Sequence, residues 1–276
     1  MKAGLIVDNQ SIDYGDYLKR TAMHSAMHKC DSVSEVVQVV KNVENKMGFW
    51  RFAGLQFQRL KAKDRLDKLE KFCDRFFLNE IASEVDILFP SSQYEFCDGL
   101  KILCGMSEYD WHKYFEIPKE KAGVVFTYFL NKKSNDIREF INRISTFTSD
   151  DIVEFHSKDT NQKKHFNRGL DDFVRELVGA DVVITDSAAV VATAVVFNVP
   201  FVIDNRFVSG SDELNTLIED LNLSSRCFGN VTEVNQALEF DFNNVSSVIY
   251  NWREMSSRKM DDIVSGKETS DETNAI

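Results

Sequence analysis

The spacing of hydrophobic and polar positions along the first forty residues follows two patterns, one typical of strands and one typical of helices. Residues 2–7 form a short apolar run that ends in polar residues, which predicts a buried strand leading into a loop. Apolar side chains then recur at helical spacing from Tyr17 to about Lys29, behind Gly15. Residues 35–40 fit either a strand, because of their valines, or the start of a helix behind a Ser34 cap.

The next part of the chain is expected to be largely helical. Between residues 43 and 81 there is no proline, and leucines and phenylalanines fall three or four apart, which predicts one or two long helices. Residues 85–89 then have the pattern of a strand, which stops at Pro90. The aromatic segment 94–118 has no clear period, so no element is assigned to it.

After Pro118, strands and helices alternate regularly. We expect strands at 123–130, 151–155, 181–185 and 200–203, and helices at 135–145, 170–178, 187–197, 211–221 and 245–264. Uniformly apolar strands that alternate with helices indicate a parallel sheet covered on both faces. The sequence therefore predicts two α/β halves that divide near Pro118. Ligands of such sheets bind at the carboxyl ends of the strands, so the expected site is a cleft between the halves.

Composition and charge narrow the choice of function. The chain has 276 residues, of which 43% are hydrophobic, so it can bury a large core and is neither disordered nor a disulfide scaffold. Twelve glycines and three prolines are too few for a turn-rich all-β sandwich. The 33 basic and 44 acidic residues give a net charge of −11, which repels phosphate backbones. We therefore expect no nucleic-acid partner.

The cysteines and the N-terminal segment indicate a cytoplasmic protein. No two of the five cysteines have the two-residue spacing of a zinc knuckle, so we expect reduced thiols, no metal site and no cofactor. The apolar stretch at the N-terminus is too short for a signal peptide or a membrane span.

Polar loops at the expected strand ends carry the first candidate residues. Thr185, Asp186 and Ser187 lie between a strand and a helix, where Ser187 either caps the helix or contacts an anion. The equivalent loops of the first half hold two further groups. These groups are Asn9, Gln10, Tyr14 and Gly15, and Ser91, Ser92 and Gln93.

Basic residues give a second set of candidates. His165 and Arg168 belong to a basic loop, which either binds an anion or is a solvated surface loop. Arg206 follows the strand at 200–203 and is either a ligand contact or part of an ion pair. His24 and His28 have the helical spacing of metal ligands, but two histidines on a polar face are the favoured interpretation, because no third ligand is visible.

One segment resembles a known family. Residues 172–187 read Asp-Phe-Val-Arg-Glu-Leu-Val-Gly-Ala-Asp-Val-Val-Ile-Thr-Asp-Ser, and residues 197–201 read Phe-Asn-Val-Pro-Phe. This resembles the polysaccharide pyruvyl transferase family, whose core has the form A-D-x-V-I-T-D-S-F-H-G before a helix and a "P-F" strand. Further matches to the family's motifs follow in the expected order, loosely at residues 9–22 and 85–93 and more strongly at residues 125–130 and 215–226.

The resemblance implies a fold similar to GT-B, with two Rossmann-like halves around a cleft and a C-terminal helix that crosses back to the first half. The implied organisation is a first half with a helical insertion over 1–118, a second half over 119–242, a crossing helix over 243–264 and a disordered tail over 265–276. Members transfer an enolpyruvyl-derived group from phosphoenolpyruvate to a sugar of a surface polysaccharide. The implied partners are a small-molecule donor, phosphoenolpyruvate or a nucleotide sugar, and a glycan or glycolipid acceptor; a homo-oligomer is also allowed.

The chain departs from the family pattern at three loops. Ala189 stands where the family has histidine, and an alanine can neither donate a proton nor hold a phosphate. Glu213 stands where the family has a basic residue, and Ser92 where it has aspartate. Three hypotheses therefore stay open. They are a transferase related to the pyruvyl transferases, a non-catalytic homologue that binds a sugar or a partner enzyme, and a nucleotide-sugar-dependent glycosyltransferase.

The candidate site residues follow from these motifs. A substitute for the missing acid is sought first in Asp186 and His165, which are the candidate catalytic residues. The candidate donor-binding or substrate-binding residues are Thr185, Ser187, Ala188, Arg168, Arg206, Asn9, Tyr14, Gly15, Ser92 and Gln93.

Overall fold

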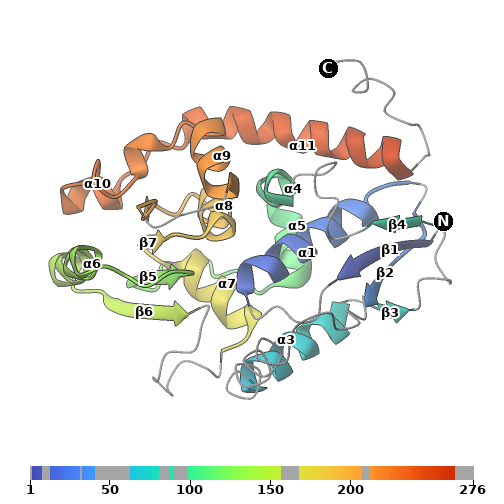
Figure 1. Ribbon diagram of the computed structural model, residues 1–276, viewed down its shortest axis with the longest axis horizontal. Helices are drawn as coiled ribbons and strands as arrows, with labels where there is room; N and C mark the ends of the chain where they lie inside the picture. Colours follow the sequence, from blue (N-terminus) through green and yellow to red (C-terminus); the bar gives the residue numbers. More distant parts are fainter. Residues whose placement is uncertain are drawn as a thin grey trace, which may run out of the picture.

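The computed structural model contains two four-stranded parallel sheets with helices packed around them (Figure 1). It describes residues 2–7, 13–31, 33–40, 63–76, 78–80, 87–89, 99–156, 168–206 and 212–264. The first sheet has the strand order β3-β2-β1-β4 and the second β6-β5-β7-β8. The strands are β1 (Lys2–Val7), β2 (Glu35–Val40), β3 (Leu78–Glu80), β4 (Ile87–Phe89), β5 (Val124–Phe129), β6 (Asp151–His156), β7 (Val182–Thr185) and β8 (Phe201–Ile203).

Helices connect most of these strands. In the first half they are α1 (Tyr14–His28), α3 (Lys63–Phe76), α4 (Gly99–Gly105) and α5 (Glu108–Tyr114). In the second half they are α6 (Asn135–Thr148), α7 (Leu170–Gly179), α8 (Ala188–Val196), α9 (Asp212–Asp220), the 3₁₀ turn η2 (Ser224–Arg226) and α10 (Val234–Leu238). The last helix is α11 (Asn243–Val264).

The first sheet resolves one open prediction and corrects another. Residues 35–40 are a strand, because β2 pairs in parallel with β1 along its whole length. The long helix predicted up to residue 81 is wrong at residues 78–80, which form β3 and pair with β2. A periodic pattern reports only near neighbours and misses a short strand whose partner lies forty residues earlier. Helix α3 confirms part of that prediction, and residues 43–62 lie outside the described ranges.

The second sheet follows the predicted alternation closely. All six residues of β5 are buried, as expected for a strand covered on both faces. Phe126 and Tyr128 of β5 belong to the core that includes α7 and α8, whereas Val125 and Phe129 pack with the α6 side. Helix α8 is built mostly from alanine and valine and is almost entirely buried, so it packs closely under the sheet.

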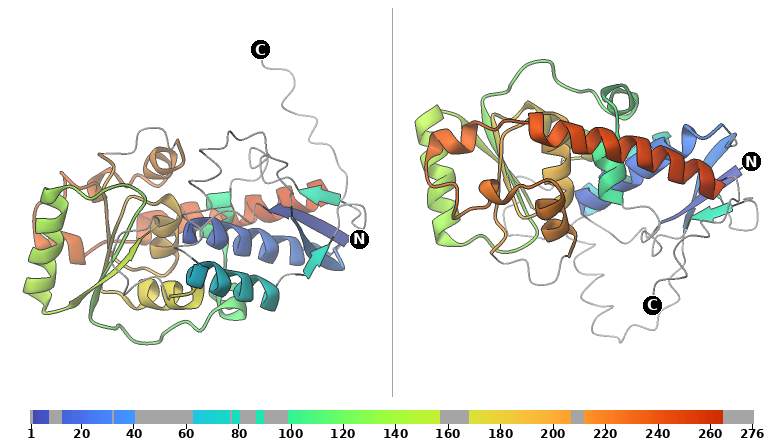
Figure 2. Two further views of the ribbon diagram at one scale, coloured as in Figure 1. Left: turned by 60° about the horizontal axis from the view of Figure 1, so that its bottom comes forward. Right: turned by 90° about the horizontal axis from the view of Figure 1, so that it is seen from above.

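Helix α11 crosses from the second half to the first (Figures 1 and 2). It packs along α4 and reaches α1, although the elements that precede it belong to the second half. Arg253 fixes this contact, because its Nε donates to the carbonyl oxygen of Gly105 at 2.7 Å. The segment without a predicted element contains α4, which packs against α11, α1 and α8, and α5, whose Tyr114 hydroxyl lies 2.8 Å from His24 of α1.

The two halves share one hydrophobic core. The rings of Tyr14 from α1 and Phe173 from α7 stack with centroids 4.4 Å apart, and both side chains are fully buried. Tyr128 of β5 donates a hydrogen bond to Asp13, just before α1, at 2.7 Å. The expected GT-B-like α/β architecture, with two Rossmann-like halves and a crossing helix, is confirmed, and aromatic rings fill this part of the junction. The precise domain limits remain a prediction, and residues 265–276 lie outside the described ranges.

Candidate functional site

The structure brings most of the described candidate residues to the carboxyl edge of the second sheet. Thr185, Asp186, Ser187 and Ala188 form the turn between β7 and α8, which the N-terminus of α1 approaches. Other candidates border the same edge. They are Tyr14 and Gly15 at the start of α1, Arg168 just before α7 and Arg206 just after β8. The predicted residues Asn9, Ser92, Gln93 and His165 lie outside the described ranges.

Hydrogen bonds hold the β7–α8 turn in place. Thr185 Oγ1 donates to the carbonyl oxygen of Tyr128 at 2.6 Å and accepts from the Ser187 amide at 3.0 Å. The Asp186 carboxylate accepts from the amides of Leu130 and Asn131 at 2.6 and 2.9 Å. Burial raises the pKa of Asp186, and these hydrogen bonds oppose the rise. Asp186 thus ties two strand-end loops together.

Ser187 stands at the N-cap position of α8, but its side chain makes no capping hydrogen bond. The residue is only 3% exposed. The first N–H groups of a helix lack partners within the helix and carry partial positive charge, which favours anions. Helix capping therefore does not account for the serine side chain at this position. Its hydroxyl lies at a position suited to an anionic ligand.

The start of α1 packs closely against Ala189 of α8. A Cβ placed on Gly15 would lie 3.1 Å from the Cβ of Ala189 and 3.2 Å from an Asp13 carboxylate oxygen. Helix α1 therefore approaches α8 here at the limit of van der Waals contact, and Ala189 is 5% exposed.

A group of basic side chains, which we call the cation cluster, lies between the halves. It consists of Arg65, Lys133, His156 and Arg168. The guanidinium of Arg65, from α3, lies 4.9 Å from the centroid of the Tyr14 ring. The guanidinium of Arg168 lies 5.1 Å from the Phe155 ring, and Tyr14 donates to the Arg168 carbonyl oxygen at 2.8 Å. The two arginines thus flank the same pair of packed rings, whose centroids are 5.7 Å apart.

The electrostatics of the cation cluster suit a bound anion. Burial, together with the charges of Lys133 and Arg65, lowers the pKa of His156 to about 4, although a Glu154 carboxylate oxygen lies 3.5 Å from its Nε2. His156 is therefore neutral at pH 7. Lys133 forms an ion pair with Glu154. Arg168 differs, because its Nη1 is buried and has no hydrogen-bond partner within the described residues.

Sequence reasoning missed most of this cluster. Lys133 and His156 follow the expected strands at 123–130 and 151–155, so the strand-end rule that selected Ser187 points to them as well. No local signal distinguishes Arg65, which comes from α3 of the other half and is 2% exposed. Only the packing of the two halves places it near His156.

Other charged candidates are engaged within the protein. Arg206 contacts Asp204 at 2.9 Å and Asp136 at 3.5 Å. Arg226 donates to the carbonyl oxygens of four residues, which are Phe201, Gln236, Ala237 and Glu239. Glu213, which stands where the pyruvyl transferase motif has a basic residue, pairs with Lys19 of α1 at 3.1 Å. The Glu213 carboxylate therefore links α9 to α1, and Lys19 balances its charge.

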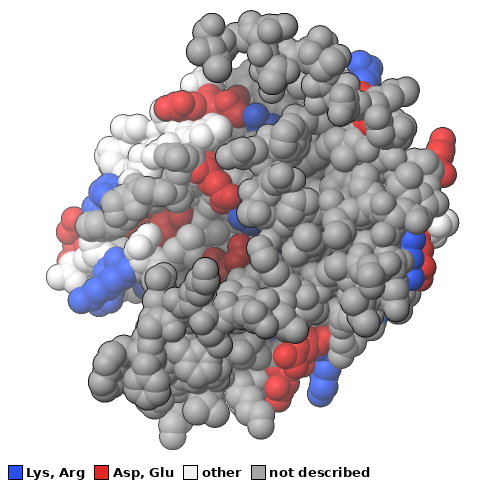
Figure 3. Space-filling model, turned by 45° about the vertical axis from the view of Figure 1, so that its right-hand side comes forward, with Lys and Arg blue, Asp and Glu red and all other residues white. Residues whose placement is uncertain are grey.

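Several classes of site find no support in the described residues. No three His, Cys, Asp or Glu side chains gather there in a way that could hold a metal ion. None of the described helices combines the length and apolar character needed to cross a bilayer. Figure 3 shows acidic and basic side chains interspersed, without an extended patch of one sign among the coloured residues.

Comparisons with known proteins add two structural likenesses. No family model matches the chain, and no curated protein has a similar sequence. The calicheamicin glycosyltransferase CalG4 aligns with a TM-score of 0.45 and 10% identity, over 97% of this chain and 99% of CalG4. The glycotransferase of kitacinnamycin aligns with a TM-score of 0.34 and 12% identity, over 95% of this chain and 74% of that one.

Proposed function

We propose that this protein is a sugar-modifying transferase that binds a phosphorylated donor between its two halves. The leading donor class is a nucleotide sugar, and the acceptor is a glycan or glycolipid. The observation that carries the proposal is the buried Nη1 of Arg168, which has no hydrogen-bond partner within the described residues. Buried donors are nearly always paired, so an unpaired guanidinium N–H at a sheet junction indicates a missing acceptor such as a phosphate oxygen.

Two features on the same sheet edge support a phosphate ligand. The N-terminus of α8 carries Ser187, whose hydroxyl is not used as a cap. Arg65 adds positive charge near His156, in a chain whose net charge is −11, whereas Glu154 balances the charge of Lys133. Positive charge retained locally in an acidic protein concentrates anionic ligands at that place.

The missing acid favours a nucleotide sugar over phosphoenolpyruvate. Transfer of an enolpyruvyl group requires an acid that protonates the enol carbon, and Ala189 has no proton to give. Glycosyl transfer instead breaks the bond between the sugar's anomeric carbon and the phosphate oxygen, which leaves with the bonding electrons. The acceptor hydroxyl attacks that carbon and gives its proton to a base, while cations stabilise the departing phosphate.

The remaining residues receive roles within this proposal. Arg168 and Ser187 hold the donor phosphate, and Arg65 supplies further positive charge near it. Asp186 is a positioning residue, because its carboxylate already accepts hydrogen bonds from Leu130 and Asn131. His165 stays the candidate proton carrier, and Asn9, Ser92 and Gln93 stay candidate contacts of the sugar.

Ligand-induced thermal stabilisation tests the proposal. A nucleotide sugar at 100 times its dissociation constant is expected to stabilise the protein by about 2.7 kcal/mol. Arg168→Ala is expected to weaken binding at least tenfold, because it removes a charge-assisted contact, and Arg168→Lys to restore part of it. Arg175→Ala is the matched control, since Arg175 lies on α7 and, among the residues that the structure describes, forms ion pairs with Asp172 and Glu176 alone.

The competing hypotheses give different results in the same assay. Stabilisation by phosphoenolpyruvate alone would make the chain a pyruvyl transferase with a relocated acid. No stabilisation by any donor would favour the non-catalytic homologue. Binding of a nucleotide sugar without transfer to any acceptor glycan would contradict the catalytic part of the proposal.

A further inference from the structure

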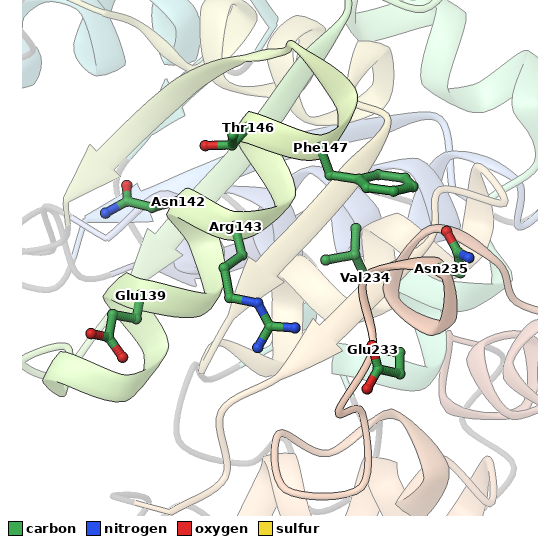
Figure 4. Close-up of a pocket in the computed structure, with 8 residues that line it drawn as sticks. All are labelled: Glu139, Asn142, Arg143, Thr146, Phe147, Glu233, Val234 and Asn235. Atoms are coloured by element: carbon green, nitrogen blue, oxygen red, sulfur yellow. The ribbon is translucent and has the colours of Figure 1, made fainter.

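A groove on the outer face of the second half lies outside the candidate site. It has a volume of about 810 Å³ and runs between α6 and α10 (Figure 4). The residues that line it are Glu139, Asn142, Arg143, Thr146, Phe147, Glu233, Val234 and Asn235. All of them except Val234 are exposed.

The groove and the candidate site lie at different places on the second sheet. Helix α6 follows β5 and returns before β6 begins in parallel to β5, so its last turn lies at the amino edge of the sheet. Phe147 belongs to that last turn, whereas Ser187 stands at the carboxyl edge. A change at Phe147 therefore leaves the cation cluster and the β7–α8 turn untouched.

Phe147 is the residue of the groove on which the inference depends, because its large apolar side chain is 63% exposed. The apolar face of α6 is already buried through Ile137, Phe140, Ile141 and Ile144, so the helix does not need Phe147 for its packing. In Figure 4 the ring points toward Val234 and Asn235 on the opposite wall. The ring thus offers a flat apolar surface beside a polar wall.

The charges of the groove restrict the ligand. Arg143 and Glu233 extend into the same space from α6 and from the start of α10, and no ion pair joins them within the described residues. Their charged heads can therefore serve as a hydrogen-bond donor and an acceptor for a ligand. With Glu139, the lining contains two carboxylates and one guanidinium. This excess of negative charge disfavours phosphorylated or other anionic ligands.

We infer that this groove binds a neutral oligosaccharide. A sugar ring has an apolar face of C–H groups, which stacks on an exposed aromatic ring, and a rim of hydroxyls, which pair with planar side chains such as those of Arg143, Glu233 and Asn235. The volume exceeds that of a single monosaccharide. If the proposed transferase function is right, the occupant is a distant part of the acceptor glycan, and this identification alone rests on that function.

The test measures oligosaccharide binding to the full chain without any donor. An array of neutral glycans selects the tightest binder, and isothermal titration calorimetry gives its dissociation constant. Phe147→Ala is expected to weaken binding roughly tenfold, since an aromatic contact is worth about that factor. Tyr250→Ala is the matched control, because Tyr250 is 60% exposed on α11 and does not line the groove, and its loss is expected to leave the constant unchanged.

Three outcomes would overturn the inference. They are the absence of binding to every neutral glycan, a preference for anionic glycans, and equal binding by Phe147→Ala and the unmodified chain. The donor assay on Phe147→Ala separates this inference from the proposed function. Glycan binding that depends on Phe147 together with no response to any donor would leave the groove standing and reject the transferase. Donor binding without glycan binding would reject the groove as a glycan site and leave the proposed transferase function standing.

Discussion

At the scale of single residues, burial decides the chemistry of His24. The side chain is 3% exposed, and its Nδ1 lies 2.8 Å from the hydroxyl of Tyr114. The interpretation of His24 and His28 as two histidines on a polar face is therefore wrong for His24 and holds only for His28, which is exposed. Burial, together with positive charge on His28 and Lys113, lowers the pKa of His24 to about 3.

The lowered pKa predicts a loss of stability in acid. An unfolded histidine has a pKa near 6.5, so between that value and about 3 the unfolded chain binds a proton that folded His24 does not. His24 is therefore expected to lower the free energy of unfolding by about 2 kcal/mol between pH 7.5 and pH 5. Urea denaturation at the two pH values measures this difference.

His24→Gln isolates the contribution, because glutamine does not titrate and can still pair with Tyr114. The difference between the two pH values is expected to shrink by about 2 kcal/mol in this variant. His112→Gln is the control, since His112 is half-exposed on α5 and its substitution is expected to leave the difference unchanged. An identical pH response of His24→Gln and the unmodified chain would show that folded His24 takes up protons as freely as unfolded His24.

At the scale of elements, α11 shows how one amphipathic helix joins the two halves. Its buried side chains, among them Val245, Trp252 and Met260, belong to the shared core. Tyr250 and Met255 lie outside this buried face and are 60% and 67% exposed. Lys101 of α4 also places its ammonium 5.4 Å from the centroid of the Trp252 ring. The helix therefore contributes stability mainly through the Trp252 face.

Trp252→Ala is expected to destabilise the protein by about 3 kcal/mol, because it opens a cavity between α11 and α4. Tyr250→Ala is expected to change stability by less than about 0.5 kcal/mol, since its exposed side chain leaves no cavity. Urea denaturation followed by circular dichroism measures both values. Equal losses in the two variants would contradict the packing of Trp252 against the first half.

At the scale of the whole molecule, the shared core makes the two sheets interdependent. Tyr14 of the first half is enclosed by Tyr128, Phe155 and Phe173 of the second, with ring centroids between 4.4 and 6.0 Å apart. Neither half can expose this junction without uncovering large aromatic surfaces. Apolar area of this kind stabilises by roughly 25 cal/mol per Å².

We therefore expect one cooperative unfolding transition rather than two. Tryptophan fluorescence and far-ultraviolet circular dichroism should give coincident urea curves, because Trp111 and Trp252 lie in the same core as the sheets. Tyr14→Ala is expected to lower the midpoint of both curves together. Two separated transitions in the unmodified chain would contradict a single shared core.

The elements whose signals are local can be predicted from the amino-acid sequence alone. Strands β5 to β8 and the helices between them were predicted because apolar runs and helical periods depend on near neighbours in the chain. The strand-end turn at Thr185 to Ser187 followed for the same reason, since parallel strands place their polar loops at one edge. The resemblance to a two-half fold extended these local signals to the whole chain.

The features that join distant segments become visible only in the tertiary structure. Strand β3 exists because β2 pairs with it, and the place of Arg65 near His156 depends on how α3 packs against the second half. The close contact between α1 and α8 is of the same kind, because a Cβ added at Gly15 would lie only 3.1 Å from the Cβ of Ala189. Each of these features depends on contacts between residues far apart in the chain, which no local pattern encodes.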